Sequence, residues 1–132
     1  MKNQPSESHP NPCEGVLADL PNPLLEMFLR QQKMQAIALN EMVPKDSPVQ
    51  FYLHATACMV ELGEAIQCDT RWKTLIGGKR PAHVDEEDKL EELVDAFHFL
   101  INAFLFSGFG YADLVRVFDR KWAANIARQQ KE

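Results

Sequence analysis

The chain has 132 residues, a mass of 15.1 kDa and a formal net charge of −5, with 45% hydrophobic and 25% charged residues. This length suits a single domain that buries a core without metal or disulfide staples. The negative charge argues against a protein that coats nucleic acid or an anionic membrane, so we expect neither partner.

The cysteines and the apolar runs indicate a cellular compartment. Cys13, Cys58 and Cys68 show no CxxC or other metal-like spacing, and an odd number does not suit a secreted disulfide framework. No basic-then-apolar leader opens the sequence, and its longest nearly apolar run, residues 97–106, is well short of the roughly 20 residues that span a bilayer. We therefore expect a soluble cytoplasmic protein with reduced thiols.

The first part of the chain predicts an arm followed by a helix. Residues 1–21 are polar and contain several prolines, which predicts an irregular N-terminal arm, with residues 22–132 as the domain. Asn22 followed by Pro23 is typical of a helix start. Apolar residues then recur at helical spacing and predict a helix that ends near Val43.

A second predicted helix begins at Ser47-Pro48 and runs to about Trp72. The Gly-Gly and Pro of residues 75–83 predict a loop.

The last part of the chain predicts two more helices. Acidic residues 85–88 suit the positive N-terminal end of a third helix, which should stop at Ser107-Gly108. A fourth helix begins near Tyr111. Four helices without a credible strand predict an all-α antiparallel four-helix bundle. Apolar helix faces on so short a chain also predict pairing with a second copy.

Two pairs of carboxylates stand inside otherwise apolar helices: Glu61 with Glu64, and Glu92 with Asp95. Residues three apart differ by ~60° around a helix, so the members of each pair share a side. If these helices pack antiparallel, the four carboxylates converge and need cations. Oxygen ligands favour Mg²⁺, with Mn²⁺ as the alternative, and Mg²⁺ typically shares substrate phosphates. A polyphosphate is the implied substrate.

The third helix extends this polar side at steps of about one turn, through Glu91, Asp95, His98 and Asn102. Such a row is typical of a pocket wall. A single ExxE pair is usually a solvated face, however. A helical interaction protein, whose acidic stripes are solvated or bind divalent ions without turnover, therefore stays an alternative.

Four segments together resemble the dimeric, all-α dUTPases within the MazG-like nucleoside triphosphate pyrophosphohydrolases: ACMVELGEAIQ, RWK, EELVDAFHFLINAF and RKWAANIARQ. The likeness covers roughly Leu24 to Gln129. It implies hydrolysis of dUTP, with dUDP as a further substrate, to dUMP in a homodimer whose sites share residues across the interface. A MazG-like house-cleaning enzyme that acts on dCTP or modified nucleotides stays an alternative.

The resemblance also implies roles for individual residues. Glu61, Glu64, Glu92 and Asp95 would bind Mg²⁺, and Glu61 or Glu64 would accept a proton from the attacking water. The resemblance implies substrate contacts for Gln32 on the first helix, for Trp72 and Lys73 beside the nucleotide, and for Lys121, Asn125 and Arg128 near the phosphates. The polar row of the third helix adds His98 and Asn102 as candidates, and Gln35 is a further candidate on the first helix. Gln35 stands where the family usually has asparagine or aspartate, so the base preference stays open. Tryptophans such as Trp72 are also typical of cores and interfaces.

Overall fold

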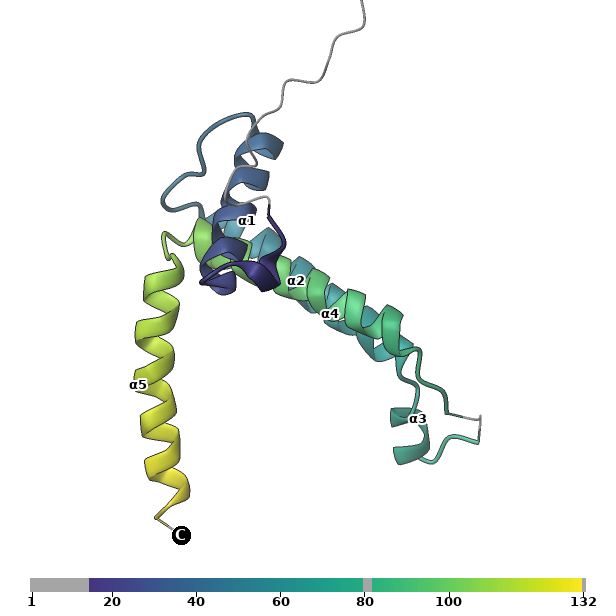
Figure 1. The fold of residues 1–132 in the computed structure, drawn as a ribbon. Coiled ribbons are helices and arrows are strands. Elements are labelled where there is room, and N and C mark those ends of the chain that lie inside the picture. Colours follow the sequence, from purple (N-terminus) through teal and green to yellow (C-terminus); the bar gives the residue numbers. More distant parts are fainter. Residues whose placement is uncertain (1–14, 80–81, 132) are drawn as a thin grey trace, which may run out of the picture.

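The computed structural model describes residues 15–79 and 82–131. These residues contain no strand beyond one isolated bridge, which confirms the predicted all-α class. A short 3-10 helix, Leu17–Asp19, is the regular structure in the described part of the predicted arm; residues 1–14 of that arm lie outside the described residues. The five α-helices are α1 (Pro23–Leu39), α2 (Pro48–Cys68), α3 (Trp72–Leu75), α4 (Glu86–Phe106) and α5 (Tyr111–Gln129) (Figure 1).

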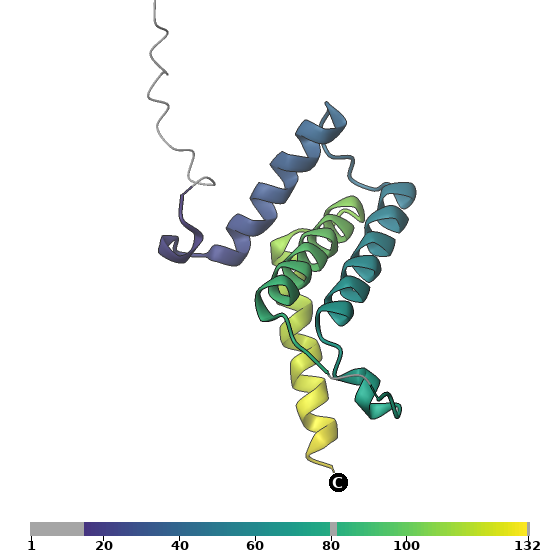
Figure 2. The same ribbon diagram turned by 90° about the vertical axis from the view of Figure 1, so that its right-hand side faces the viewer.

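The helices α2 and α4 form the centre of the fold, and both views show them side by side (Figures 1 and 2). They run antiparallel, because backbone hydrogen bonds tie opposite ends together. The Ser47 N–H donates to the Phe106 carbonyl at 2.8 Å, and the Asp85 N–H donates to the Cys68 carbonyl at 2.8 Å. Small buried residues on each helix, Ala65 and Ala96 among them, allow a close approach. This arrangement sets the two predicted carboxylate pairs opposite one another.

The start of α1 follows the sequence prediction, whereas its end does not. The Asn22 side chain accepts a hydrogen bond from the Leu25 N–H at 3.1 Å, and Pro23 occupies the first turn. The helix ends at Leu39 and not near Val43, because Asn40 adopts a left-handed conformation with φ of 54°. Asparagine is one of the few residues that tolerate this conformation at a helix end.

The second predicted helix is divided into two, so the described residues form five α-helices where the sequence predicted four. The break lies at Asp69, whose backbone is extended. The Asp69 carboxylate accepts from the Arg71 guanidinium at 2.7 and 2.8 Å and from Lys89 Nζ at 2.8 Å. These contacts, which we call the Asp69 clamp, tie the end of α2 to the first turns of α4.

The helix α5 leaves the end of α4 at a bend of 103° and projects away from the α2–α4 pair (Figure 1). Gly108 makes the corner with φ of 82°, and a side chain there would collide with the Lys45 carbonyl oxygen. The Gly110 N–H donates to Asp113 at 3.0 Å and fixes the start of α5. Within the described ranges, one chain therefore does not close the predicted four-helix bundle.

The helix α1 crosses the C-terminal half of α4 and the start of α5. The Phe28 ring packs edge-on against Phe104, with ring centroids 6.0 Å apart, and against Tyr111 at 6.4 Å. Phe28 is buried there together with Ile101 and Phe106. No single described helix is long and apolar enough to cross a membrane; α4 and α5 together, across their bend, meet the length and composition that a span requires.

Candidate metal and nucleotide site

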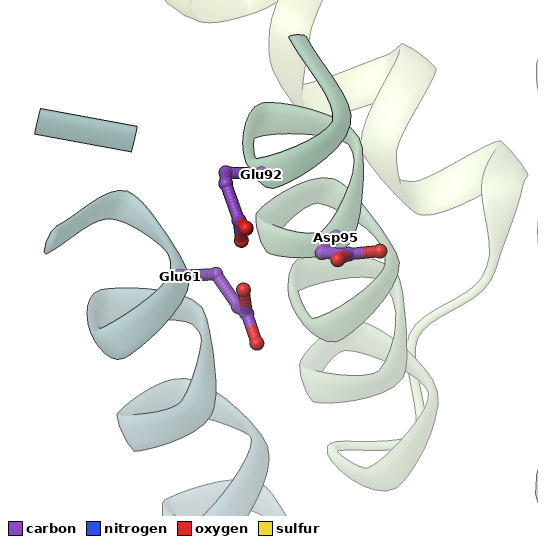
Figure 3. Close-up of side chains that lie close together, drawn as sticks. All are labelled: Glu61, Glu92 and Asp95. Atoms are coloured by element: carbon purple, nitrogen blue, oxygen red, sulfur yellow. The ribbon is translucent and has the colours of Figure 1, made fainter. Parts of the chain in front are cut away.

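Three predicted carboxylates meet between α2 and α4. One oxygen from each of Glu61, Glu92 and Asp95 lies within 4.8 Å of the others. Figure 3 shows Glu61 of α2 and Glu92 of α4 directed toward one another, with Asp95 one turn farther along α4. Glu61 and Glu92 are half-buried, whereas Asp95 is exposed. We call these three residues the acidic cluster.

Glu92 shows that the cluster is electrostatically unsatisfied without a cation. The neighbouring carboxyls of Glu61 and then Glu64 favour its protonated form, and partial burial adds to this, so the pKa of Glu92 is raised to about 7. Its Oε2 is buried and has no hydrogen-bond partner. The other buried, unpartnered side-chain atoms in the described part of the chain belong to Glu26 and Arg30, which are opposite charges one turn apart on α1.

Glu64, the fourth predicted ligand, lies beside the acidic cluster without joining it. Its side chain is exposed, yet its carboxyl contributes to the raised pKa of Glu92. The same negative field reaches Cys68, whose pKa is raised by loss of hydration and by nearby carboxylates, Asp88 and Glu92 first among them. Cys58 and Cys68 are free thiols, and Cys13 lies outside the described residues.

The polar row of α4 continues from the cluster to a set of buried amides. His98 is exposed, with Nδ1 3.9 Å from an Asp95 carboxylate oxygen. Asn102 is 2% exposed and uses both ends of its amide: its Oδ1 accepts from Gln31 Nε2 at 3.0 Å, and its Nδ2 lies 3.2 Å from His54 Nδ1. Sequence reasoning did not select Gln31 or His54.

Both omitted residues occupy helical positions that mark the inner face. Gln31 follows the buried Phe28 by three residues, and His54 precedes Glu61 by two turns on α2. This spacing is the sequence signal that identifies them.

A family model described as dUTPase matches residues 23–106, which is more than half of the chain. The chain belongs to the dUTPase family. This confirms the resemblance found in the sequence and assigns it to the all-α dUTPases. No protein of curated function and no solved structure matches the chain. The family description places the chain among nucleotide hydrolases.

The dUTPase family match covers α1 to α4 and therefore includes both carboxylate pairs. Two further predicted nucleotide residues, Gln32 and Gln35, lie on α1. Gln32 is exposed, whereas Gln35 is half-buried and follows Gln31 by one turn. The residue of α1 that bonds to the polar row is thus Gln31, the immediate neighbour of the predicted Gln32.

The remaining predicted substrate residues lie apart from the acidic cluster in this dUTPase-family chain. Trp72 is 36% exposed on α3, beyond the Asp69 clamp, and Lys73 Nζ lies 5.6 Å from the centre of its ring. Those on α5 are all exposed, and the backbone of α5 does not pack along α2 or α4. The Arg128 guanidinium donates to the Asn125 Oδ1 within that helix. These predicted residues of α5 are Lys121, Asn125 and Arg128.

The donor chemistry of the acidic cluster fits a divalent metal of the kind implied for this dUTPase-family site. All ligands are carboxylate oxygens, which Mg²⁺ and Mn²⁺ prefer over softer donors. The buried, unpartnered Oε2 of Glu92 is a position that a cation would satisfy. The cluster therefore fits Mg²⁺, which Glu61, Glu92 and Asp95 would hold, with the Glu64 carboxyl nearby.

Proposed function

We propose that this protein is a Mg²⁺-dependent pyrophosphohydrolase that converts dUTP, and also dUDP, to dUMP. The observation that carries this proposal is the buried Glu92 oxygen without a partner inside an acidic cluster, in a chain of the dUTPase family. An acidic protein that must hold a triphosphate needs cations between the two sets of negative charge.

The proposed roles divide between proton transfer and charge. The chemistry that Mg²⁺ supplies when bound is Lewis acidity, which lowers the pKa of a water ligand and offsets charge on phosphate oxygens. Glu61 or Glu64 accepts the proton of the attacking water, and Glu92 and Asp95 complete the metal ligands. The cationic side chains that supplement the metal on the phosphates are Lys73, Lys121 and Arg128.

A homodimer completes the proposed site. One apolar stripe of α5, made of Val115, Phe118, Trp122 and Ile126, is between 36% and 63% exposed. Leu62, Ile66 and Leu93 are also exposed, and they line an apolar groove of about 670 Å³ on the α2–α4 pair. Surfaces of this kind mark interfaces. The fixed corner at Gly108 prevents α5 from folding back over its own groove, so we assign both surfaces to a second copy.

The charges of the helices support this pairing. The helix α5 carries four cationic residues and two aspartates, whereas the first three turns of α4 are strongly acidic. A partner that lays α5 near α4 would bring Lys121 and Arg128 toward the acidic cluster. Trp122→Glu should therefore produce monomers in sedimentation analysis. Arg120→Glu, about 200° around the helix from Trp122, is the matched control and should stay dimeric.

The experiment that tests the hydrolase proposal measures pyrophosphate release from equal concentrations of dUTP, dCTP, dTTP and UTP, with Mg²⁺ and with EDTA. We expect Mg²⁺-dependent release with dUTP preferred. Turnover led by dCTP or by all four nucleotides would replace the proposal with a house-cleaning pyrophosphohydrolase. No turnover of any nucleotide would contradict hydrolysis and favour a binding protein.

A further inference from the structure

The middle of α1 is anchored by an amide and not by an apolar side chain. Gln31 is 4% exposed and is the last buried residue of α1, whereas Met34 and Ile37 beyond it are more than half exposed. The backbone of α1 packs on α4 and not on α2. The Gln31 amide bonds to Asn102 of α4, which in turn reaches His54 of α2. We call Gln31, Asn102 and His54 the amide bridge, and it joins three helices.

The hydrogen bonds of the amide bridge run in one direction. Gln31 Nε2 lies 3.5 Å from the His98 carbonyl oxygen and 3.0 Å from Asn102 Oδ1. A backbone carbonyl can only accept, so Gln31 turns its NH₂ group toward both oxygens. Asn102 therefore turns its own NH₂ group toward His54 Nδ1, at 3.2 Å. Because an NH₂ group can only donate, Nδ1 accepts, and the proton of the neutral His54 ring lies on Nε2.

A second proton on His54 would break this pattern. It would occupy Nδ1 and set an N–H donor against the NH₂ group of Asn102. If Asn102 turned by 180°, its NH₂ group would face that of Gln31, and a turn of Gln31 would then set its oxygen against the His98 carbonyl. That carbonyl belongs to a helix and cannot turn. Wherever the mismatch lies, the buried amides lose at least one hydrogen bond.

The surroundings of His54 also oppose its charged form. Its ring stacks on Phe106, with ring centroids 4.9 Å apart. The groups that face it from α4 and α1 are the uncharged amides of the bridge. On the same sides of the helices, the titratable side chains one turn away are Cys58 in α2 and His98, which precedes Asn102 in α4. Burial lowers the pKa of His54, and within the described ranges no charged side chain contributes to this shift.

We infer that His54 is an acid-sensitive latch whose protonation releases the middle of α1 from the α2–α4 pair. Above the unfolded pKa of 6.5, the neutral ring completes the amide bridge and its contribution to stability is fully present. That contribution is lost as the pH falls through the lower pKa of the folded state. The start of α1 stays attached, because Asn22 Nδ2 donates to the Tyr111 hydroxyl at 2.8 Å. The latch does not depend on the proposed hydrolysis, so its tests need no substrate.

The first test reads the proton positions and the pKa of His54 from NMR of its ring nitrogens, in the full chain with EDTA. We expect an unprotonated Nδ1 in neutral wild type and a pKa below 6.5. In Asn102→Asp the carboxylate still accepts from Gln31 and also offers an acceptor to His54, so the pKa of His54 should rise above 6.5. A proton on Nδ1 in neutral wild type, or a pKa that does not rise in Asn102→Asp, would overturn the inference.

The second test locates the release by amide hydrogen exchange at pH 7.5 and pH 5.5, compared as protection factors. In wild type, protection of residues 31–39 should fall in acid by roughly tenfold or more, and protection in the centre of α2 should fall by less. His54→Asn has an acceptor oxygen in place of Nδ1 and no titrating ring, so this fall should vanish.

His98→Gln is the matched control for the exchange measurement. It removes a titrating ring from α4 and keeps the backbone carbonyl that Gln31 faces, so residues 31–39 should lose protection in acid as they do in wild type. The same fall in His54→Asn as in wild type, or no fall in His98→Gln, would assign the acid response to another group and overturn the latch. If His54→Asn does not fold, the pKa of His54 in Asn102→Asp decides.

Discussion

Two carboxylates near the junction of α2 and α4 have opposite surroundings. Asp69 accepts hydrogen bonds from Arg71 and Lys89, which hold its pKa well below the usual range. Glu92 faces Glu61 and Glu64, and its pKa is raised to about 7. The same junction therefore holds one carboxylate with two cationic partners and one carboxylate with none.

The difference argues that the acidic cluster is not a solvated helix face. A solvated carboxylate keeps its hydration and its ordinary pKa, whereas Glu92 has a buried oxygen without any partner. Nearby cations exist in the chain, but the Asp69 clamp uses them. The acidic cluster therefore lacks positive charge, which a metal ion would supply. The Asp69 clamp has no such deficit, because Arg71 and Lys89 balance its carboxylate.

The largest expected effect is on turnover. Asp95→Asn and Glu61→Gln each remove a proposed metal ligand and should lower dUTP hydrolysis by at least about 100-fold. Folding should stay intact, because each change removes a charge from a mutually repelling group. Glu87→Gln, an exposed acid in the first turn of α4, is the control and should keep full activity. Full activity in both cluster variants would exclude this cluster as the metal site.

The second effect is stabilisation by Mg²⁺. A ligand present at 100 times its Kd adds about 2.7 kcal/mol to the free energy of unfolding, so the Tm of wild type should rise on addition of Mg²⁺. Glu92→Gln should show a much smaller rise, since it lacks the carboxylate. Asp69→Asn should respond as wild type does, measured by differential scanning calorimetry. An equal rise in Tm in all three proteins would mean that Mg²⁺ does not bind at the acidic cluster.

The third prediction is a pair of opposite pH dependences in EDTA. Asp69 has a lowered folded pKa, so its contribution to stability is present above its unfolded pKa near 3.8 and is lost as the pH falls through its folded pKa. Glu92 has a raised folded pKa, so its contribution is present below its unfolded pKa of 4.5 and is lost as the pH rises through about 7.

Thermal melts of the variants check both signs. Asp69→Asn should have a lower Tm than wild type at neutral pH, and the two should converge in acid. Glu92→Gln should have a higher Tm than metal-free wild type at pH 8, which is above the raised pKa of Glu92, and the two should converge below pH 4.5. The same sign for both variants at pH 8 would contradict the contrast between clamp and cluster.

Much of the fold was predictable because its determinants are local. Asn22-Pro23 and Ser47-Pro48 fixed the starts of α1 and α2, and α4 spans Glu86–Phe106, close to the expected limits. The meeting of Glu61, Glu92 and Asp95 followed from helical spacing and an antiparallel pairing, with Glu64 beside them. The break at Asp69 was missed, because it depends on Lys89, which lies twenty residues away.

Two other features depend on contacts that no local pattern carries. The direction of α5 is set by Gly108 against the Lys45 carbonyl, a contact between distant segments. The choice between adjacent glutamines on α1 is equally non-local: Gln31 is buried because Asn102 and the His98 carbonyl bond to it. Local patterns do not settle the burial of Gln31 or His54, since burial of a polar side chain is favourable only with partners, and theirs lie on other helices.

The smallest expected effect separates the two cations of the Asp69 clamp. The Arg71 side chain is 64% exposed and bonds only two residues away, whereas Lys89 is 34% exposed and joins α4 to the end of α2. Exposed pairs are screened by water and contribute little. Lys89→Met should therefore lower the Tm by a few degrees, and Arg71→Met by less, in the same buffer with EDTA. The reverse order would mean that the clamp stabilises the turn before α3 and not the packing of α2 on α4. The position of Glu92 opposite Glu61 would then depend on the α2–α4 core alone.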